Sequence, residues 1–416
     1  MNVRRSFAAL TASAVLCAVA APAAAAASES PKPSAKLPAG LFGSKDPTYD
    51  GVWRQSLALL AQDAAGAVPA KKAVDWLVGQ QCDEGGFAAY RADAKADCDK
   101  KTQVDSNSTA IAVQALAALG GHDKEMTAAV EWLESVQNKD GGWGYMPGGP
   151  SDANSTSVVI GALTAADKDP EDVLAGKKKS PYDALLDLQL GCGRKASEQG
   201  AFAYQPDKSG KLAPNLDATA AAALAGLGKN LIVVPAGAKN EDVEPLDCGA
   251  ADSKDQREPD EAAAGASYQL AAALKKDKHL EAVAPGADKP VPDHANTADA
   301  VIALAAGGHR DAARASLAWL EKNSAAWTKD NPAGIAVLVL AARAAGENPR
   351  AFGGTDLVRT LSETGPQPQS LGPASGTAGE ADEEGTDSRT VWWLVGAGLI
   401  AGAGIGFVLT ARKKKQ

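Results

Sequence analysis

The sequence has no excess of positive charge and contains few histidines. Its 42 Lys and Arg residues are outnumbered by 51 Asp and Glu residues, so the formal net charge is −9 at pH 7. Such a surface repels nucleic acid and favours solubility, and we expect no nucleic-acid partner. The four histidines offer no cluster typical of a zinc site, so we predict no metal site and no required cofactor.

Segments with the alternating pattern of a half-buried β-strand are also scarce. Only Leu231 to Val234 shows period-two alternation, and it is too short to change the fold class. The sequence therefore argues against a β-sheet protein. It contains helical segments of two kinds instead, which lie between two hydrophobic ends.

The two ends predict a secreted protein that is anchored in the membrane. Arg4 and Arg5 precede an apolar run and a stretch of small residues that ends near Ala27, which is the pattern of a cleaved signal peptide. From Val391 to Thr410, about twenty apolar residues could span a bilayer, and the basic residues after them would stay in the cytoplasm. We predict a single-pass protein of the cell membrane with an extracellular domain and a cytoplasmic C-terminus.

Composition divides the chain into six parts. We predict a signal peptide at 1–27, a linker at 28–44, an ectodomain at 45–363, an acidic, Pro- and Gly-rich stalk at 364–389, a transmembrane helix at 390–411 and a basic tail at 412–416. The linker and the stalk lack the apolar content to form a core.

Four cysteines remain after removal of the signal peptide, namely Cys82, Cys98, Cys192 and Cys248. An even number in an oxidising compartment predicts two disulfides, for which three connectivities exist. We favour Cys82 with Cys98 and Cys192 with Cys248, because each pair is local and would fix a long loop.

An internal repeat organises the ectodomain. The pattern W-L-x3-Q-x3-G-G-[FW] occurs from Trp76 to Phe87 and again from Trp132 to Trp143. A looser copy runs from Leu185 to Phe202, and an eroded copy begins at Trp319. The segments that carry this pattern are amphipathic, as in helices that have one face on a core.

A second, polar signature opens the segment that follows each copy. It reads Asp-Ser-Asn-Ser-Thr at 105–109, Asp-Ala-Asn-Ser-Thr at 152–156, Asn-Leu-Asp-Ala-Thr at 215–219 and Asp-His-Ala-Asn-Thr at 293–297. The residues after each Thr are apolar nearly all round, as in a helix that is buried on all sides.

Amphipathic and buried helices alternate along the chain, which predicts an all-α fold. Buried helices are expected to begin near Trp53, Thr109, Thr156, Thr219, Thr297 and Ala333. Amphipathic helices are expected near Lys71, Glu125, Pro181, Glu261, Arg310 and Gly354. Six inner and six outer helices close naturally into an (α/α)6 barrel, or toroid, with the outer-to-inner loops at one end.

The polar signatures and the loop aromatics would then surround one mouth of the barrel. One interpretation is structural, because Asp, Asn, Ser and Thr cap helices and Gly lets a loop turn. The other is functional, because each signature supplies two or three polar groups where one cap is needed. On that interpretation the ligand-binding residues are Asp105, Asn107, Thr109, Asp152, Asn154, Thr156, Asn215, Asp217, Thr219, Asp293, Asn296, Thr297, Phe87, Tyr90, Trp143, Tyr145, Phe202 and Tyr204.

From Lys71 to Leu227, the repeats resemble the QW-type repeats of squalene-hopene cyclases and the helix pairs of protein prenyltransferase β-subunits. Those cyclases protonate an alkene with the middle Asp of a D-x-D-D-T-A motif. The nearest matches here, at 105–109 and 152–156, have Asn in the place of that acid, and an amide cannot deliver the proton. The prenyltransferases hold zinc with Asp, Cys and His, for which no matching cluster is present. We therefore predict no catalytic residue.

The fold also looks like the α-domain of intrinsic factor and transcobalamin, in which an Asp-Thr-x-Ala signature opens the inner helices. Asp217-Ala-Thr219-Ala220 and Asn296-Thr297-Ala298 are similar in kind. The usual β-rich second domain is absent. The resemblance implies that a corrinoid binds at the mouth, where amide partners and apolar surfaces meet.

We accordingly favour a surface protein that captures a corrinoid-like small molecule for uptake, with a membrane transporter as its partner. Two alternatives stay open. A cyclase-like enzyme would need an acid in the cavity, for which Asp105 with Asp152 is the candidate pair. An interaction scaffold would have a sealed mouth and a broad apolar outer patch.

Overall fold

The computed structural model describes residues 37–235, 240–249, 257–283 and 289–372. The predicted signal peptide and transmembrane helix, at 1–27 and 390–411, lie outside these ranges. Among the described residues, no helix combines the length and the apolar character that crossing a membrane requires.

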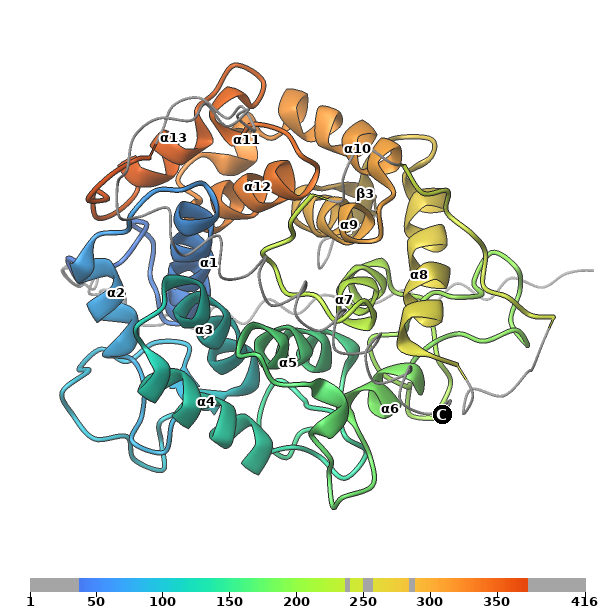
Figure 1. Ribbon diagram of the computed structural model, residues 1–416, viewed down its shortest axis with the longest axis horizontal. Helices are drawn as coiled ribbons and strands as arrows, with labels where there is room; N and C mark the ends of the chain where they lie inside the picture. Colours follow the sequence, from blue (N-terminus) through green and yellow to red (C-terminus); the bar gives the residue numbers. More distant parts are fainter. Residues whose placement is uncertain (1–36, 236–239, 250–256, 284–288, 373–416) are drawn as a thin grey trace, which may run out of the picture.

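Two rings of helices make up the described part of the chain (Figure 1). The inner helices pack one on the next, and the last packs on the first, so the inner ring is closed. They are α1 (Gly51–Ala64), α3 (Ser106–Leu119), α5 (Ala153–Ala165), α7 (Leu216–Gly226), α9 (His294–Ala306) and α12 (Pro332–Ala344). The outer helices are α2 (Lys71–Val78), α4 (Asp123–Ser135), α6 (Pro181–Leu186), α8 (Pro259–Leu274), α10 (Arg310–Asn323) and α13 (Leu357–Glu363).

Each outer helix packs on the inner helix that precedes it in the chain. The predicted alternation of six buried and six amphipathic helices is therefore confirmed within the described residues. The inner helices are rich in Ala and apolar around most of their circumference, so they can lie close together and be covered on several sides. Outer helices such as α10 bury one face only, through Ala313, Leu317 and Leu320.

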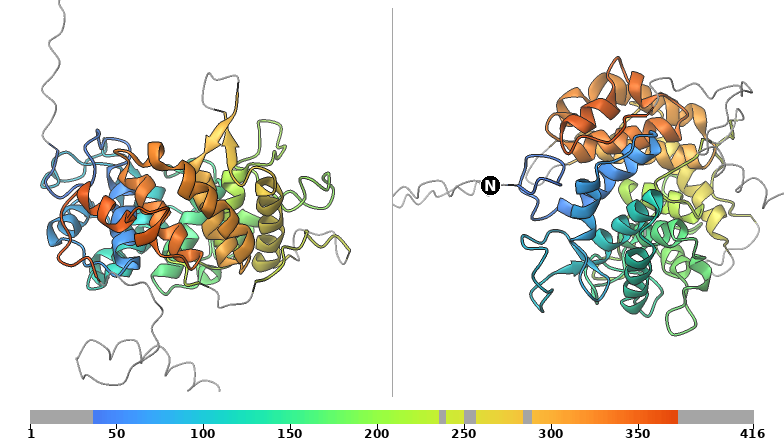
Figure 2. Two further views of the ribbon diagram at one scale, coloured as in Figure 1. Left: turned by 90° about the horizontal axis from the view of Figure 1, so that it is seen from above. Right: turned by 60° about the vertical axis from the view of Figure 1, so that its left-hand side comes forward.

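Short elements complete the connections between the two rings. Two antiparallel sheets of two strands each lie in outer-to-inner loops: β1 (Phe87–Ala88) with β2 (Val104–Asp105), and β3 (Leu280–Ala282) with β4 (Val291–Asp293). The strands β3 and β4 project from one face of the ring, and β4 leads directly into α9 (Figure 2). The helix α11 (Ala325–Thr328) and the 3-10 turns η1 (Pro170–Asp172) and η3 (Pro349–Ala351) are single turns.

The folded domain extends beyond the predicted limits of 45 and 363. Phe42 is fully buried, and the Gly43 N–H donates to the Thr364 carbonyl at 2.8 Å. A Cβ on Gly365 would lie 2.3 Å from the Phe42 ring, so the two segments touch closely. Residues 37–44 and 364–372, which composition assigned to a linker and a stalk, are thus part of the toroid. Their few apolar residues suffice because the neighbouring helices supply the rest of the core.

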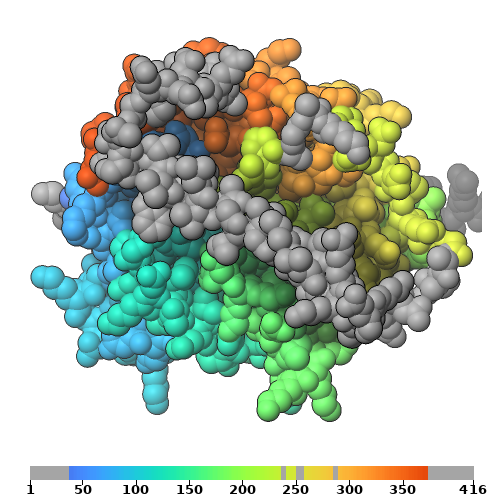
Figure 3. Space-filling model, in the orientation of Figure 1, coloured from blue at the N-terminus to red at the C-terminus, as the bar shows by residue number. Residues whose placement is uncertain are grey.

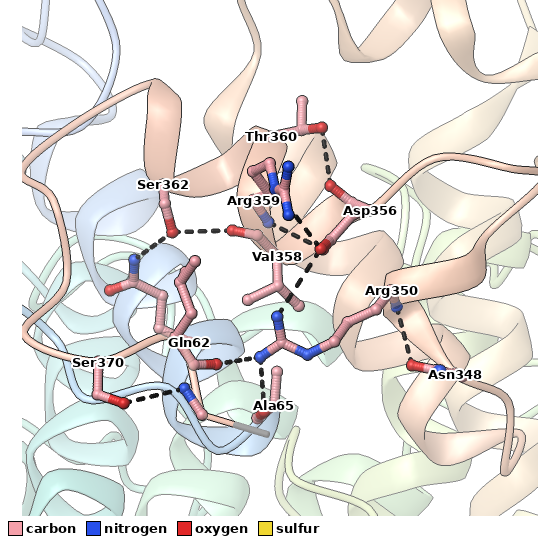
Figure 4. A network of polar contacts seen from close by, with 12 residues as sticks. Gln62, Ala65, Asn348, Arg350, Asp356, Val358, Arg359, Thr360, Ser362 and Ser370 are labelled. Atoms are coloured by element: carbon pink, nitrogen blue, oxygen red, sulfur yellow. Dashed lines mark hydrogen bonds and ion pairs between the residues drawn. The ribbon is translucent and has the colours of Figure 1, made fainter. Parts of the chain in front are cut away.

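A polar network joins the last helix pair to the first (Figure 4). The Gln62 side chain donates to the Ser362 hydroxyl at 3.2 Å, and that hydroxyl donates to the Val358 carbonyl at 2.8 Å. Arg350 donates to the Ala65 carbonyl and forms an ion pair with Asp356. Two of these contacts, Gln62 with Ser362 and Arg350 with Ala65, link residues that are 300 and 285 positions apart in the chain, and they close the ring.

Both predicted disulfides are present. Cys82 is bonded to Cys98 and Cys192 to Cys248, with a Cα–Cα distance of 5.6 Å in each pair. The preference for local pairing is confirmed.

Candidate functional site

The first residue of each polar signature caps an inner helix. The Asp105 carboxylate accepts the Ser108 N–H at 2.6 Å, and the Asp152 carboxylate accepts the Ser155 N–H at 2.7 Å. Asn215 and Asp293 cap α7 and α9 in the same way. Such a cap satisfies one of the free N–H groups of a helix start. The structural interpretation therefore holds for this position.

The Thr that ends each signature accepts a hydrogen bond from the preceding loop and so holds that loop against the helix. The Thr109, Thr156 and Thr219 hydroxyls accept the N–H groups of Phe87, Trp143 and Phe202 at 2.8, 3.1 and 3.0 Å. Thr297 accepts the Leu280 N–H at 2.9 Å. All four Thr residues are completely buried. They do not line the central cavity described below, and the expectation that they face a ligand at the mouth is wrong.

The aromatic residues that follow the two Gly-Gly pairs, and Phe202 after Gly200-Ala201, belong to the core. Phe87, Trp143 and Phe202 are at most 1% exposed, so the expectation that they surround the mouth is also wrong. The paired glycines explain the placement. A Cβ on Gly85 would lie 2.1 Å from the Ala128 carbonyl oxygen, so the loop lies close against α4, the next outer helix. In this position of the loop, the Phe87 side chain points into the core.

The three tyrosines lie outside the cavity. Tyr90 stacks on Trp76 of α2, with 6.4 Å between ring centroids. Tyr145 and Tyr204 are nearly half exposed, beside the caps of α3 and α5, where their carbonyls accept the N–H groups of Ser106 and Ala153 at 3.0 Å. They stand next to the capping carboxylates rather than across the barrel mouth.

The capping carboxylates of α3 and α5, Asp105 and Asp152, are buried and are not part of the cavity lining. Burial raises the pKa of Asp105 to about 6 and raises the pKa of Asp152 as well. Neither side chain lines the central cavity, so they are not the inward-facing acid pair that the sequence suggested.

A cavity of about 490 Å³ lies inside the inner ring, and all six inner helices contribute to it. Its wall is apolar over most of its area, with polar side chains near the start of the inner helices and also at the opposite end, where Gln114, Lys229 and Asn230 lie. The lining side chains include Trp53, Leu57, Asn107, Asn154, Ser157, Asp217, Ala221, Leu224, Ala295, Asp299, Ile302, Trp327, Asn331 and Val337.

The chain after α7 covers the other end of the cavity. Lys229, Asn230 and Leu231 are in its lining, and the Leu231 N–H donates to the Gln114 side chain of α3 at 3.1 Å. Figure 3 shows the yellow-green atoms of this chain segment beside the orange atoms of α12. Gln114 also donates to the Val158 carbonyl of α5, so it holds this segment in place.

The third residue of the signature is the one that reaches the cavity. Asn107, Asn154 and Asp217 each stand two positions before the buried Thr, and all three line the cavity. The Asn154 amide donates to the Asp217 carboxylate at 2.6 Å. The side-chain oxygens of Asn107 and Asn154 are buried and have no partner among the described residues.

Asp299 is a cavity residue that the signature does not include. On α9 the third position is occupied by Ala295, and Asp299 lies one turn further along the same face. Burial raises the pKa of Asp299 to about 7, with a further contribution from the negative charges of Asp217 and Asp293. The sequence alone could have pointed to Asp299, because it is the only acidic residue in α9.

The sequence-based argument against a catalytic acid overlooked Asp217. The copies at 105–109 and 152–156 have Asn at the third position, but the copy at 215–219 has a carboxylate there. Burial raises the pKa of Asp217, as do the charges of Asp293 and Asp152. Among the described residues, no group of three or more His, Cys, Asp or Glu residues is placed to hold a metal ion.

A family model matches part of the chain. Residues 47–187 match the family model of the prenyltransferase alpha-alpha toroid domain, which confirms the resemblance to toroid repeats over this part of the chain. A protein from Actinoplanes of known crystal structure is 15% identical, with a TM-score of 0.46, over 74% of this chain and 95% of that one. A sugar epimerase from a ruminal bacterium is 14% identical, with a TM-score of 0.44, over 68% and 80%. No curated protein matches the sequence.

Proposed function

We propose that the protein binds a small organic molecule in the central cavity of its toroid. The observation that carries the proposal is a cavity of about 490 Å³ with an apolar wall and a few convergent polar groups. Ligand pockets typically have volumes of roughly 300 to 1,000 Å³ and this distribution of polarity.

Unpartnered polar groups in the wall support a ligand rather than a merely structural space. The side-chain oxygens of Asn107, Asn154 and Ser157 are buried without partners among the described residues. Leaving such a group unpaired costs about 1 to 3 kcal/mol, so most of them are satisfied in folded proteins. A bound molecule that donates hydrogen bonds to these oxygens would recover that free energy.

Filling the cavity tests the proposal. Ala221 lines the cavity on α7, and Ala221→Leu adds a side chain that occupies part of the space. We expect the affinity for any ligand found by screening to fall at least tenfold, because about 1.4 kcal/mol of lost contact already gives that factor. Ala318→Leu, on the exposed face of α10, is the matched control and should bind normally. Equal affinity of both variants would place the ligand elsewhere.

A corrinoid is the specific ligand that the sequence predicted, and it stays a candidate. The amides of Asn107 and Asn154 support it, whereas the buried rings of Phe87, Trp143 and Phe202 are not available to stack on a macrocycle. Calorimetry and absorbance with cyanocobalamin decide this point. Absence of heat and of a spectral shift at high micromolar concentration would remove the corrinoid but not the cavity.

An acid–base enzyme is the second candidate. The observation that favours it is the raised pKa of Asp217 and Asp299 inside the cavity, because a general acid works best with a pKa near the ambient pH. Mass spectrometry of a bound ligand after incubation separates the two functions. A ligand recovered unchanged supports binding alone, and a product that disappears in Asp217→Asn supports the enzyme.

We further propose that the segment at 390–411 anchors the toroid at the outer face of the cell membrane, with a transporter as its partner. The apolar run, the basic residues after it and the disulfides, which persist in oxidising compartments, support this topology. Intact cells treated with an impermeant amine reagent should show labelled lysines in the toroid. Lysines that react only after lysis would contradict the topology.

A further inference from the structure

We infer that the cavity selects an organic cation, namely a primary or secondary ammonium group on an apolar body. The inference rests on the proposed function and narrows its ligand. It follows from three features of the wall: uncompensated negative charge, oxygen atoms that lack donors, and two tryptophans beside an apolar surface.

Negative charge gathers where α7 and α9 begin. Asp217 and Asp299 line the cavity, and Asp293 at the cap of α9 is close enough to raise the pKa of both. Within the described part of the chain, every ion pair involves other carboxylates. These three acids therefore have no cationic partner there.

The one cationic side chain in the described lining lies at the far end of the cavity. Lys229 follows the last turn of α7, whereas Asp217 stands in the first turn. A helix of this length separates them by about 15 Å, which is several times the distance of an ion pair. Lys229 is also exposed, so it does little to neutralise the acids.

The unpartnered oxygens in the wall need hydrogen-bond donors. The Asn154 amide nitrogen is engaged by Asp217, which fixes the amide oxygen as the group that faces the ligand. Ser157 lies one turn deeper on α5, is 6% exposed, and its hydroxyl has no partner in the described structure. An ammonium group offers two or three N–H donors, and its bonds to carboxylates are roughly twice as strong as neutral ones.

The rest of the wall suits an apolar body beside the charge. Leu57, Leu224 and Ile302 line the cavity, and Trp53 and Trp327 contribute aromatic surface. Tryptophan is the best of the aromatic side chains at attracting a cation to its ring face. An anion would be repelled by the acids, and a neutral alcohol could donate only one hydrogen bond to them, without the attraction between opposite charges.

Three probes of similar shape test the inference on the full-length protein in detergent. They are 2-phenylethylammonium, 2-phenylethanol and phenylacetate. We expect the ammonium probe to bind at least tenfold more tightly than the alcohol by calorimetry, and phenylacetate not to bind. Asp217→Asn should remove most of the preference, whereas Glu131→Gln, an exposed charge on α4, should keep it.

The outcomes separate this inference from the proposed function. If 2-phenylethanol binds as tightly as the ammonium, and Ala221→Leu blocks it, the cavity binds ligands but does not select cations. A preference for the cation that survives both Asp217→Asn and Asp299→Asn would also overturn the inference. If no probe binds at millimolar concentration, the inference fails, whereas the proposed function is still decided by the comparison of Ala221→Leu with Ala318→Leu.

Discussion

Replacing Trp143 with Ala lowers the free energy of unfolding by about 3 to 5 kcal/mol, which is the usual cost of truncating a large buried aromatic side chain. Trp143 is 1% exposed and is among the largest buried side chains of the protein. Its indole N–H donates to the Leu133 carbonyl in the last turn of α4 at 2.8 Å, so the substitution also removes a buried hydrogen bond. Urea titration followed by circular dichroism measures the loss.

Tyr145 provides the control for this prediction. It lies two residues further along the same loop, but it is 45% exposed and outside the cavity. Tyr145→Ala should change the stability by about 0.5 kcal/mol or less, as is usual for surface positions. If Trp143→Ala kept full stability and instead lost ligand, the mouth assignment from the sequence would be right and the core assignment wrong.

The architecture was predictable because its causes are local in the sequence. A helix such as Ser157 to Ala165 shows no polar face, and a helix such as α10 shows one, so the alternation of inner and outer helices can be counted. Six pairs of this kind close into a ring without further information. The disulfides followed from the same local reasoning, because each joins two cysteines in one connection or in neighbouring ones.

The site was predictable only in part. Three polar residues of each signature were expected to line one mouth of the barrel, although they point to different sides of the helix. Successive residues of an α-helix are about 100° apart around its axis, so the third and fifth positions point to nearly opposite sides. Asn154 therefore faces the cavity while Thr156 turns to the loop. A side chain four positions further along, about one helical turn, points to the cavity again. Asp299 therefore lines the cavity on the same face of α9 as Ala295. The direction of Phe87 and Trp143 depends on contacts between neighbouring loops and helices, which no local pattern contains.

Replacing Asp299 with Asn stabilises the protein at pH 8 and leaves its stability almost unchanged at pH 4. The ordinary pKa of the group is 3.8, and burial together with the charges of Asp217 and Asp293 raises the pKa to about 7. The folded state thus holds the proton more tightly than the unfolded state. Its contribution is complete below about pH 4 and is lost as the pH rises through about 7.

The size of this effect follows from the shift of roughly three pKa units. Each unit corresponds to 1.36 kcal/mol, so about 4 kcal/mol is the upper bound at pH 8. Asp299 is partly accessible from the cavity, and water there reduces the effect, so we expect a gain on the order of 2 kcal/mol for Asp299→Asn. Urea titrations at pH 4, 6 and 8 measure it, with Glu131→Gln on the exposed face of α4 as the control that should show no pH-dependent gain.

The same titration controls the binding of an ammonium ligand. A cation favours the ionised form of Asp299, so below pH 7 its binding must release the proton, and the affinity falls by up to about tenfold for each further unit of pH. The affinity for 2-phenylethylammonium, which stays protonated in this range, should therefore rise from pH 5 to pH 8 in the wild type and rise less steeply in Asp299→Asn, where the raised pKa of Asp217 is the remaining contribution. The groups that face Asp299 are Asp217 on α7 and Asp293 at the start of α9. Equal pH dependence in both proteins would show that another group titrates, and equal stability of the two at pH 8 would show that Asp299 is not held in an unfavourable ionised state.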